Sequence, residues 1–423
     1  MPKFISNFKY PYYDQWDKTY NYMEFDISNI DLSLVNGIRR CILSQVNTLG
    51  FRTEPYIKSD VKIIINDSPI HNQFLTHRIG MIPIYSQDPL TFEVDNYEFI
   101  IKKENSTNDI LDITTKDIKI IRLSDNLILS ERDTRKLFPP NPITNDFIII
   151  TKLKPHPNGG DTTKIHLIMK ASIGNGEKNS RWSPVSCAAY NFTRNPTEVK
   201  TQLEKYIISQ RESYISRDLD PPSNQELTKM FNAIIADRYY QINELGEPKQ
   251  YQFRIESIGA IPPIKILYQS LIIIREKVLH FIANVVNQDV DKVDIRENKT
   301  NLKGFDFTIK GEDNTLGNIL QSHLYLLYVS QLSDDKLLNY VGYERPHPLK
   351  KHIVLTLSSK KNPLDLDYLV NTILKPGCQV MVDFCDAMLK DVMNSQEYKM
   401  VGKSRTKKVS TKPIKKSMKL SKK

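Results

Sequence analysis

The stretch DLSLVNGIRRCILSQV at residues 31–46 decides how this chain folds. Its apolar side chains recur at spacings of three and four residues, which is the period of one face of an α-helix. We expect an amphipathic helix whose buried stripe consists of Leu32, Val35, Ile38, Ile42 and Val46. Asp31 is placed to cap the start of this helix, and Gly50 to end it in the left-handed conformation.

A similar arrangement occurs near the other end of the chain. The sequence TLGNILQSHLYLLYV at residues 315–329 predicts a second amphipathic helix. One of its faces carries Leu316, Ile319, Leu320 and Leu327, together with His323. The strings LVNGI at 34–38 and LGNIL at 316–320 share apolar and Asn positions, which indicates a weak internal repeat.

Strands and further helices complete each of the two units. Alternating runs predict one strand before and one after each helix, at 23–27, 251–258, 305–309 and 353–357. Longer apolar patterns predict further helices at 264–286 and 363–393, the second interrupted at Lys375-Pro376-Gly377. Each unit therefore combines strands with helices.

The chain divides into five regions. Strand-like runs, turns rich in Pro and Gly, and helical patterns between 53 and 246 predict an inserted α+β domain. Residues 287–303 are polar without helical or strand periodicity, which predicts a flexible linker. The remaining regions are the first unit at 1–52 and 247–286, the second unit at 304–397, and a C-terminal tail at 398–423.

The positive charge of the chain is concentrated at one end. The formal net charge is +10, and ten Lys or Arg residues without any acidic residue lie between 401 and 423. The rest of the chain is neutral, which argues against a folded surface that neutralises many phosphates. The end has the composition of a disordered basic arm. It is interpreted either as a solubilising or import-like segment or as a contact with nucleic acid.

Several classes of protein are not expected. No apolar stretch reaches the length of a membrane helix, and the N-terminal residues do not resemble a secretory signal. The four cysteines, Cys41, Cys187, Cys378 and Cys385, are read as reduced core thiols. We find no nucleophile with a base, no phosphate loop and no carboxylate cluster for Mg²⁺. The sequence therefore predicts neither an enzyme that acts by itself nor a cofactor or a membrane protein. It predicts an intracellular location.

Four further strings show a resemblance to a known family. The string NDSPIHNQFLTHRIGMIPI at 66–84 is similar to a signature of the third-largest subunit of eukaryotic RNA polymerase II. The archaeal D subunit and the shared subunit of polymerases I and III carry the same signature. Similar strings are LSLVNGIRR at 32–40, SRWSPVSCAAY at 180–190 and FRIESIGAIPP at 253–263.

The C-terminal half resembles a different polymerase subunit. The strings FDFTIKGEDNTLGNIL at 305–320 and VGYERPHPLKKHIVLTLSS at 341–359 look like the eleventh subunit of RNA polymerase II and the archaeal L subunit. In cellular enzymes these are separate chains that pair like the bacterial α dimer. Their fusion, in a chain rich in Asn, Ile and Lys, resembles the arrangement in large nucleocytoplasmic DNA viruses. A viral protein is expected in the viral factory and the virion, and a cellular one in the nucleus.

The resemblance implies an α+β fold with two dimerisation modules, each a small antiparallel sheet plus helices, which pair to form an assembly platform. Helix pairing within one chain would bury Val35, Ile38, Ile42 and Val46 against Leu316, Ile319, Leu320 and Leu327. Each apolar side chain contributes about 1.5–3 kcal/mol on burial, and a tether supplies an effective concentration of about millimolar. The implied partners are the largest and second-largest polymerase subunits and small zinc-binding subunits, with DNA contacted indirectly or through the tail.

Two groups of residues are implied in docking the large subunit. They are Asn36, Arg39 and Arg40 on the first helix, and His71, Phe74, His77, Arg78 and Pro83 in the 66–84 segment. Without the resemblance, the first group reads as solvated polar residues on an exposed face. The segment departs from the family in reading Asn72-Gln73 instead of an acidic pair. The family's cysteine-bound metal in the insert is also missing, because no cysteine lies between Cys41 and Cys187, so no metal is predicted.

Overall fold

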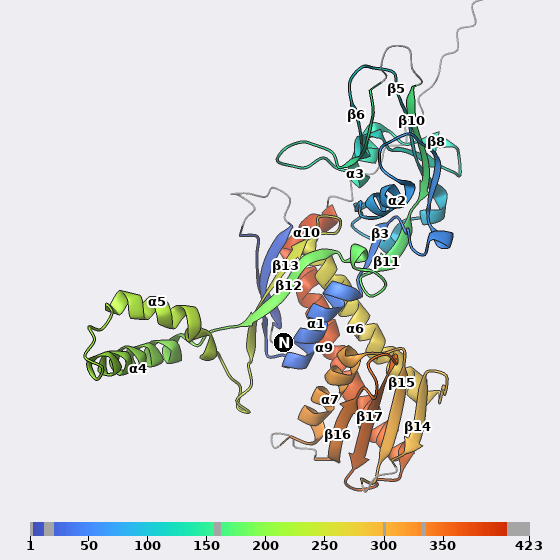
Figure 1. Ribbon diagram of the computed structural model, residues 1–423. Coiled ribbons are helices and arrows are strands. Elements are labelled where there is room, and N and C mark those ends of the chain that lie inside the picture. Colours follow the sequence, from blue (N-terminus) through green and yellow to red (C-terminus); the bar gives the residue numbers. More distant parts are fainter. Residues whose placement is uncertain (1–2, 12–20, 156–161, 299–301, 331–335, 404–423) are drawn as a thin grey trace, which may run out of the picture.

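Two dimerisation modules in one chain pack against each other, and an insert domain extends from the first (Figure 1). The computed structural model describes residues 3–11, 21–155, 162–298, 302–330 and 336–403. The basic tail predicted at 398–423 lies outside the described residues from 404 onward. Its first residues belong to helix α10, Gln396–Lys403, and are not the disordered arm that was predicted.

The first module is an antiparallel sheet covered by two helices. The sheet has the order β1-β2-β13-β12. Its strands are β1 (Ile5–Lys9), β2 (Tyr22–Ser28), β12 (Val185–Phe192) and β13 (Gln250–Ser257). The helices are α1 (Leu32–Ser44) and α6 (Pro263–Val286). Alternation of buried and partly exposed residues along β2 turns one face of the sheet toward these helices.

The second module repeats this plan. Its antiparallel sheet has the order β14-β15-β17-β16. The strands are β14 (Val293–Glu297), β15 (Phe305–Lys310), β16 (Leu338–Glu344) and β17 (His352–Ser359). The helices are α7 (Asn314–Tyr328), α8 (Leu366–Tyr368), α9 (Lys375–Asn394) and α10. A π-helical stretch, Leu369–Leu374, joins α8 to α9.

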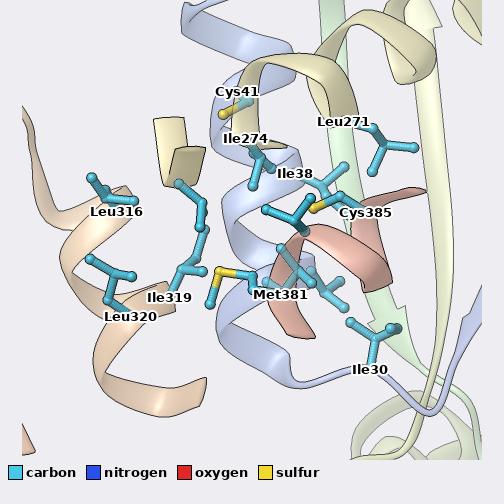
Figure 2. Close-up of a cluster of buried hydrophobic side chains, with 14 of the residues drawn as sticks. Ile30, Ile38, Cys41, Leu271, Ile274, Leu316, Ile319, Leu320, Met381 and Cys385 are labelled. Atoms are coloured by element: carbon cyan, nitrogen blue, oxygen red, sulfur yellow. The ribbon is translucent and has the colours of Figure 1, made fainter. Parts of the chain in front are cut away.

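The two modules share one hydrophobic core. Helix α1 contacts both α6 of its own module and α7 of the second module, and α9 contacts α6 and α7. Figure 2 shows Ile38 of α1 among Ile274 of α6, Ile319 of α7, and Met381 and Cys385 of α9. All five side chains are at most 2% exposed. The helices of each module therefore complete the core of the other, and neither helical layer is left facing water.

The insert domain has a separate core. Its main sheet has the order β4-β10-β5-β7-β8 and a smaller sheet pairs β6 with β9. The strands are β4 (Val61–Asn66), β5 (Tyr97–Asn105), β6 (Leu111–Thr114), β7 (Lys119–Arg122), β8 (Leu127–Ile128), β9 (Ile149–Leu153) and β10 (Thr163–Lys170). Its helices are α2 (Asn72–Gly80) and α3 (Glu131–Leu137).

A two-stranded ribbon joins the insert domain to the first module. Strand β3 (Asn47–Gly50) pairs with β11 (Ser172–Asn175). The ring of Trp182 packs over the ribbon, and a Cβ atom at Gly174 would lie 2.5 Å from it. Glycine is therefore required at this position. The string SRWSPVSCAAY thus contributes the side chain that covers the joint and the strand β12 that follows it.

A helical hairpin projects from the edge of the first sheet (Figure 1). It consists of α4 (Pro196–Ile215) and α5 (Asn224–Ile234), which contact each other. Asn195 caps α4, and Ser223 and Glu226 form a capping box at the start of α5. Helix α4 has no buried residue, so its hairpin stands away from the core.

The start of α1 follows the prediction and its end does not. The Asp31 side chain accepts a hydrogen bond from the Ser33 amide, which confirms the predicted cap. The helix ends at Ser44, with Gln45 as its C-cap. Gly50 does not end the helix, because it is paired with Ser172 in the ribbon. Backbone pairing with a strand 120 residues away takes precedence over a local stop signal.

Three other predictions on the organisation of the chain need correction. Residues 293–297, predicted as linker, form β14 and pair with β15. Strand β12, predicted within the insert, pairs with β13 in the first module. The predicted break at Lys375-Pro376-Gly377 is instead the start of α9. Proline is tolerated in the first turn of a helix, and the wider π-helical turns precede it.

Among the residues that the structure describes, no helix has the length and apolar composition needed to cross a membrane.

Replacing Ile319 by Ala should destabilise the chain strongly. Ile319 is 2% exposed and lies where α7 meets α1, so its removal leaves a cavity in the shared core. We expect a loss of about 2–5 kcal/mol in the free energy of unfolding, measured by urea denaturation. The control is Tyr325→Ala on the same helix, at a side chain that is 48% exposed, with an expected change within about 0.5 kcal/mol. Equal effects of the two substitutions would contradict the shared core.

Candidate subunit interface

The residues predicted to pair the modules come together in the structure. On α1 and directly after it, the predicted residues Val35, Ile38, Ile42 and Val46 are fully buried. On α7 the residues Leu316, Ile319 and Leu320 are at most 2% exposed. A Cβ atom at Gly37 would lie 2.5 Å from Cδ1 of Ile319, so this glycine permits the close approach of α1 and α7. Leu327 is only partly buried at the edge of the core. Leu324, which the sequence analysis did not single out, is 1% exposed and lies on the same helix face as Leu320.

His323 of α7 faces the second helix of its own module. Its Nε2 atom lies 3.1 Å from the carbonyl oxygen of Gly377 in α9, to which it donates a hydrogen bond. Burial lowers the pKa of His323, although the hydrogen bond to Gly377 acts in the opposite direction. The histidine is therefore a packing residue between α7 and α9.

Arg40 acts inside the chain. Its Nε donates to Oγ1 of Thr315 at 2.9 Å, and its Nη2 lies 3.0 Å from Oδ2 of Asp313. Both partners belong to the start of α7. This residue was assigned to docking a large subunit, and the structure uses its guanidinium to join the two modules. No local pattern indicated this contact, because the partners lie more than 270 residues away.

Asn36 and Arg39 remain on the outer side of α1. Both are partly exposed. Nε of Arg39 donates to Oδ1 of Asn36 at 3.0 Å, a spacing of three residues along the helix. This bond fixes the direction of the guanidinium before any partner binds.

The 66–84 segment presents an exposed helix on the insert domain. His71 caps α2 by accepting from the Gln73 amide, while Leu75 and Ile79 anchor the helix in the insert core. On its outer face Phe74 is 69% exposed, and His77 is also exposed.

Two further residues of this segment support its fold. Nε and Nη2 of Arg78 donate to the carbonyl oxygens of Ile150 and Ile149, at 2.9 and 2.8 Å. These bonds tie α2 to β9. Pro83 is half-buried beyond the end of α2. Arg78, predicted as a docking residue, thus has a structural contact of its own.

An apolar patch beside α2 was missed in the sequence analysis. Ile64 and Ile65 of β4 are 44% and 40% exposed, and Met81 at the end of α2 is 57% exposed. The amide of Asn66 donates to Asn72 at 2.7 Å and holds the end of β4 against the start of α2. The run VKIII at 61–65 places three isoleucines in succession, more than one buried strand face would require, which was the available signal.

The described residues provide no metal centre. No group of three or more His, Cys, Asp or Glu side chains within them is arranged to hold a metal ion. Three of the cysteines are buried in the shared core, and burial raises the pKa of Cys41, Cys378 and Cys385 to about 12. These thiols are packing residues, because the reactive thiolate form is disfavoured.

The fold thus defines two paired dimerisation modules within one chain, and comparison with known proteins agrees with it. Residues 24–278 and residues 305–391 each match the RNA polymerase Rpb3/Rpb11 dimerisation domain. The chain belongs to this family and carries two of its domains as a fused α-like subunit.

Curated proteins similar to this chain include polymerase subunits. The Dictyostelium discoideum "DNA-directed RNA polymerases I and III subunit rpac1" is 26% identical over 326 residues, covering 69% of this chain and 85% of that protein. The Schizosaccharomyces pombe "DNA-directed RNA polymerase II subunit RPB3" is 24% identical over 299 residues, covering 66% of this chain and 88% of that protein. A "Conjugation stage-specific protein" of Tetrahymena thermophila is 22% identical over 309 residues, covering 63% of this chain and 92% of that protein.

Replacing Arg78 by Gln should weaken the insert domain. The substitution removes charge-assisted donors from two backbone carbonyls, with an expected loss of about 1.5–3 kcal/mol in its unfolding free energy. Hydrogen exchange of the α2 and β9 amides should report it. The matched control is Arg132→Gln on α3, an exposed arginine for which little change is expected. Unchanged protection in the Arg78 variant would refute the contact.

The charge of Asp313 should stabilise the module contact only above acidic pH. Burial acts to raise the pKa of Asp313, but hydrogen bonds from Thr315 and Arg40 outweigh it and hold the pKa below 3.8. A lowered pKa in the folded chain stabilises it above pH 3.8, and this contribution is lost as the pH falls through the folded-state pKa.

Asp313→Asn tests this charge while keeping a good helix cap. At pH 7 we expect a loss of about 0.5–1 kcal/mol in urea denaturation, a small value because the side chain is 36% exposed. At pH 3, below the usual carboxyl pKa of 3.8, the difference from the unsubstituted chain should be smaller. An equal difference at both pH values would refute the ionic contribution.

Proposed function

We propose that the chain is the non-catalytic assembly scaffold of a multisubunit DNA-directed RNA polymerase, which docks the two largest subunits. The observation that carries the proposal is the shared core of the two modules in one chain. The helices of each module bury the apolar faces of the helices of the other. The pairing that separate polymerase subunits achieve by association is therefore complete within this chain. Its outer surfaces are then free for larger partners.

The exposed face of α2 and β4 is the proposed contact with the second-largest subunit. It presents Phe74, Met81, Ile64 and Ile65 to solvent, on a helix and strand anchored by a separate core. Exposed apolar patches on rigid elements mark interaction sites, and aromatic side chains dominate their energetics. His77 adds a polar group at the edge.

The outer side of α1 is the proposed second contact. Arg39 is pre-oriented by Asn36, and its planar guanidinium suits a carboxylate or a pair of carbonyl oxygens. Arg40 is left out of this contact, because its Nε and Nη2 atoms already donate to Thr315 and Asp313.

The identity of other partners follows from the family alone. Small zinc-binding polymerase subunits as partners, a viral origin and a location in the viral factory and virion belong to the proposal. The alternative function, nucleic-acid binding through the basic segment 401–423, rests on composition, since most of that segment lies outside the described residues.

Substituting the exposed docking residues should abolish co-purification with the second-largest subunit. We expect Phe74→Asp to reduce it at least about 30-fold, which corresponds to a hot spot of about 2 kcal/mol or more. Arg39→Glu should weaken it further. Thermal unfolding of both variants should match that of the unsubstituted chain, because neither side chain is buried.

The matched control is Arg211→Glu on α4, which reverses an exposed charge on the helical hairpin. Its co-purification should be unchanged. If the folded Phe74 and Arg39 variants retain full co-purification, the proposed docking faces are wrong.

A further inference from the structure

The three least exposed salt bridges that cross between the modules share one polarity. Nη2 of Arg40 lies 3.0 Å from Asp313, Nε of Arg275 lies 2.7 Å from Asp386, and Nζ of Lys277 lies 2.6 Å from Glu312. In each pair the cation belongs to the first module, on α1 or α6. The carboxylate belongs to the second module, directly before α7 or on α9.

A fourth carboxylate of the second module receives donors of the first. Oδ2 of Asp391 on α9 accepts from the backbone amides of Phe4 and Ile5, at 2.7 and 3.1 Å. These amides begin the edge strand β1. The first module thus presents donors and positive charge across the boundary, and the second presents acceptors and negative charge.

One ion pair runs in the opposite direction. Nζ of Lys351 in the second module lies 3.5 Å from Glu177, which follows the ribbon strand β11. Their side chains are 77% and 53% exposed, whereas Lys277 and Glu312 are 21% and 20% exposed. Exposed pairs at such separations are screened by solvent and select little. The partly buried pairs set the polarity of the boundary.

This polarity matters because the two helical layers are otherwise alike. Both present Ile, Leu and Cys side chains, and apolar contact is not directional. A contact between two first modules would leave Arg275 and Lys277 without the carboxylates of Asp386 and Glu312, and a contact between two second modules would leave these carboxylates without their cations. A partly buried charge that loses its partner opposes association, which is one way in which proteins exclude wrong partners.

We propose that Arg275 and Lys277, with Glu312 and Asp386, select the pairing of a first module with a second module, so that a second copy of this chain is accepted only by reciprocal exchange of modules. Residues 287–292 between α6 and β14 supply the hinge. Six residues span up to about 20 Å when extended. Exchange of an identical element between protomers needs no new interface.

Two variant chains test the proposal. In the first, Arg275→Glu and Lys277→Glu make the surface of the first module negative, so that both modules of this chain present negative charge at their contact. In the second, Glu312→Lys and Asp386→Arg make the surface of the second module positive, so that both modules of that chain present positive charge at their contact. Arg40 and α2 are untouched and no other polymerase subunit is present, so failure of this test is separate from failure of the proposed docking.

Each variant alone should unfold at a lower temperature than the unsubstituted chain. Co-expressed, they should form a one-to-one complex of twice 49.0 kDa, measured by light scattering after size exclusion, because each reversed module then meets an opposite charge on the other chain. A single chain with all four substitutions should return to the monomer mass and to the original melting temperature. The control Arg135→Glu, in an exposed pair with Glu131 on α3, should alter neither mass nor melting temperature.

Three results would overturn the selection by charge. The first is that the two variants are monomers with the original melting temperature. The second is that co-expression yields no one-to-one complex. The third is that the chain with all four substitutions remains as unstable as the chains with two, which would mean that these positions act within their own modules.

Discussion

Burial of helix α1 between helices of both modules is the constraint on which this structure depends. Ile38 contacts the layer formed by α6 and α9 on one side, and the path of α7 past Gly37 completes it on the other. A single helix of a small module could not hide its apolar face by itself. Because the partner helix is tethered in the same chain, the pairing costs less entropy than an association between separate subunits. The two module sheets are arranged around this core, and the insert domain and the helical hairpin extend from it.

Polar groups around the core have a different task from the apolar ones. The apolar side chains provide the free energy of pairing but do little to choose between similar surfaces. The arrangement of Arg40, Arg275 and Lys277 opposite carboxylates adds direction to the contact. Arg40 is an example of such a polar group. It was expected on an outer docking face, and it donates instead to Thr315 and Asp313 of the second module. The outer faces that remain, with Phe74 and Arg39, belong to elements that the cores hold rigid.

Membership of the Rpb3/Rpb11 dimerisation-domain family fits this division of labour. The contact between the modules of this chain lies in its helices, and a long region is inserted between α1 and its returning strand β13. In this chain that region contains a compact domain with its own core and the separate hairpin of α4 and α5. The sheet of the first module is completed only after the insert, by β12 and β13. The proposed docking surfaces thus lie on a scaffold whose two modules are held together by one shared core.

The sequence by itself determined the elements whose signals are local. The stripe through Ile38 and Ile42, the Asp31 cap and the alternation in β15 and β17 all depend on neighbours within a few residues, and they appear as predicted. Only the tertiary structure decided that Gly50 pairs with Ser172, that residues 293–297 form a strand, and that Arg78 and Arg40 bond inside the chain. These outcomes depend on backbone and charged partners tens or hundreds of residues away, and nothing in the local pattern specifies which distant group will supply the missing bond.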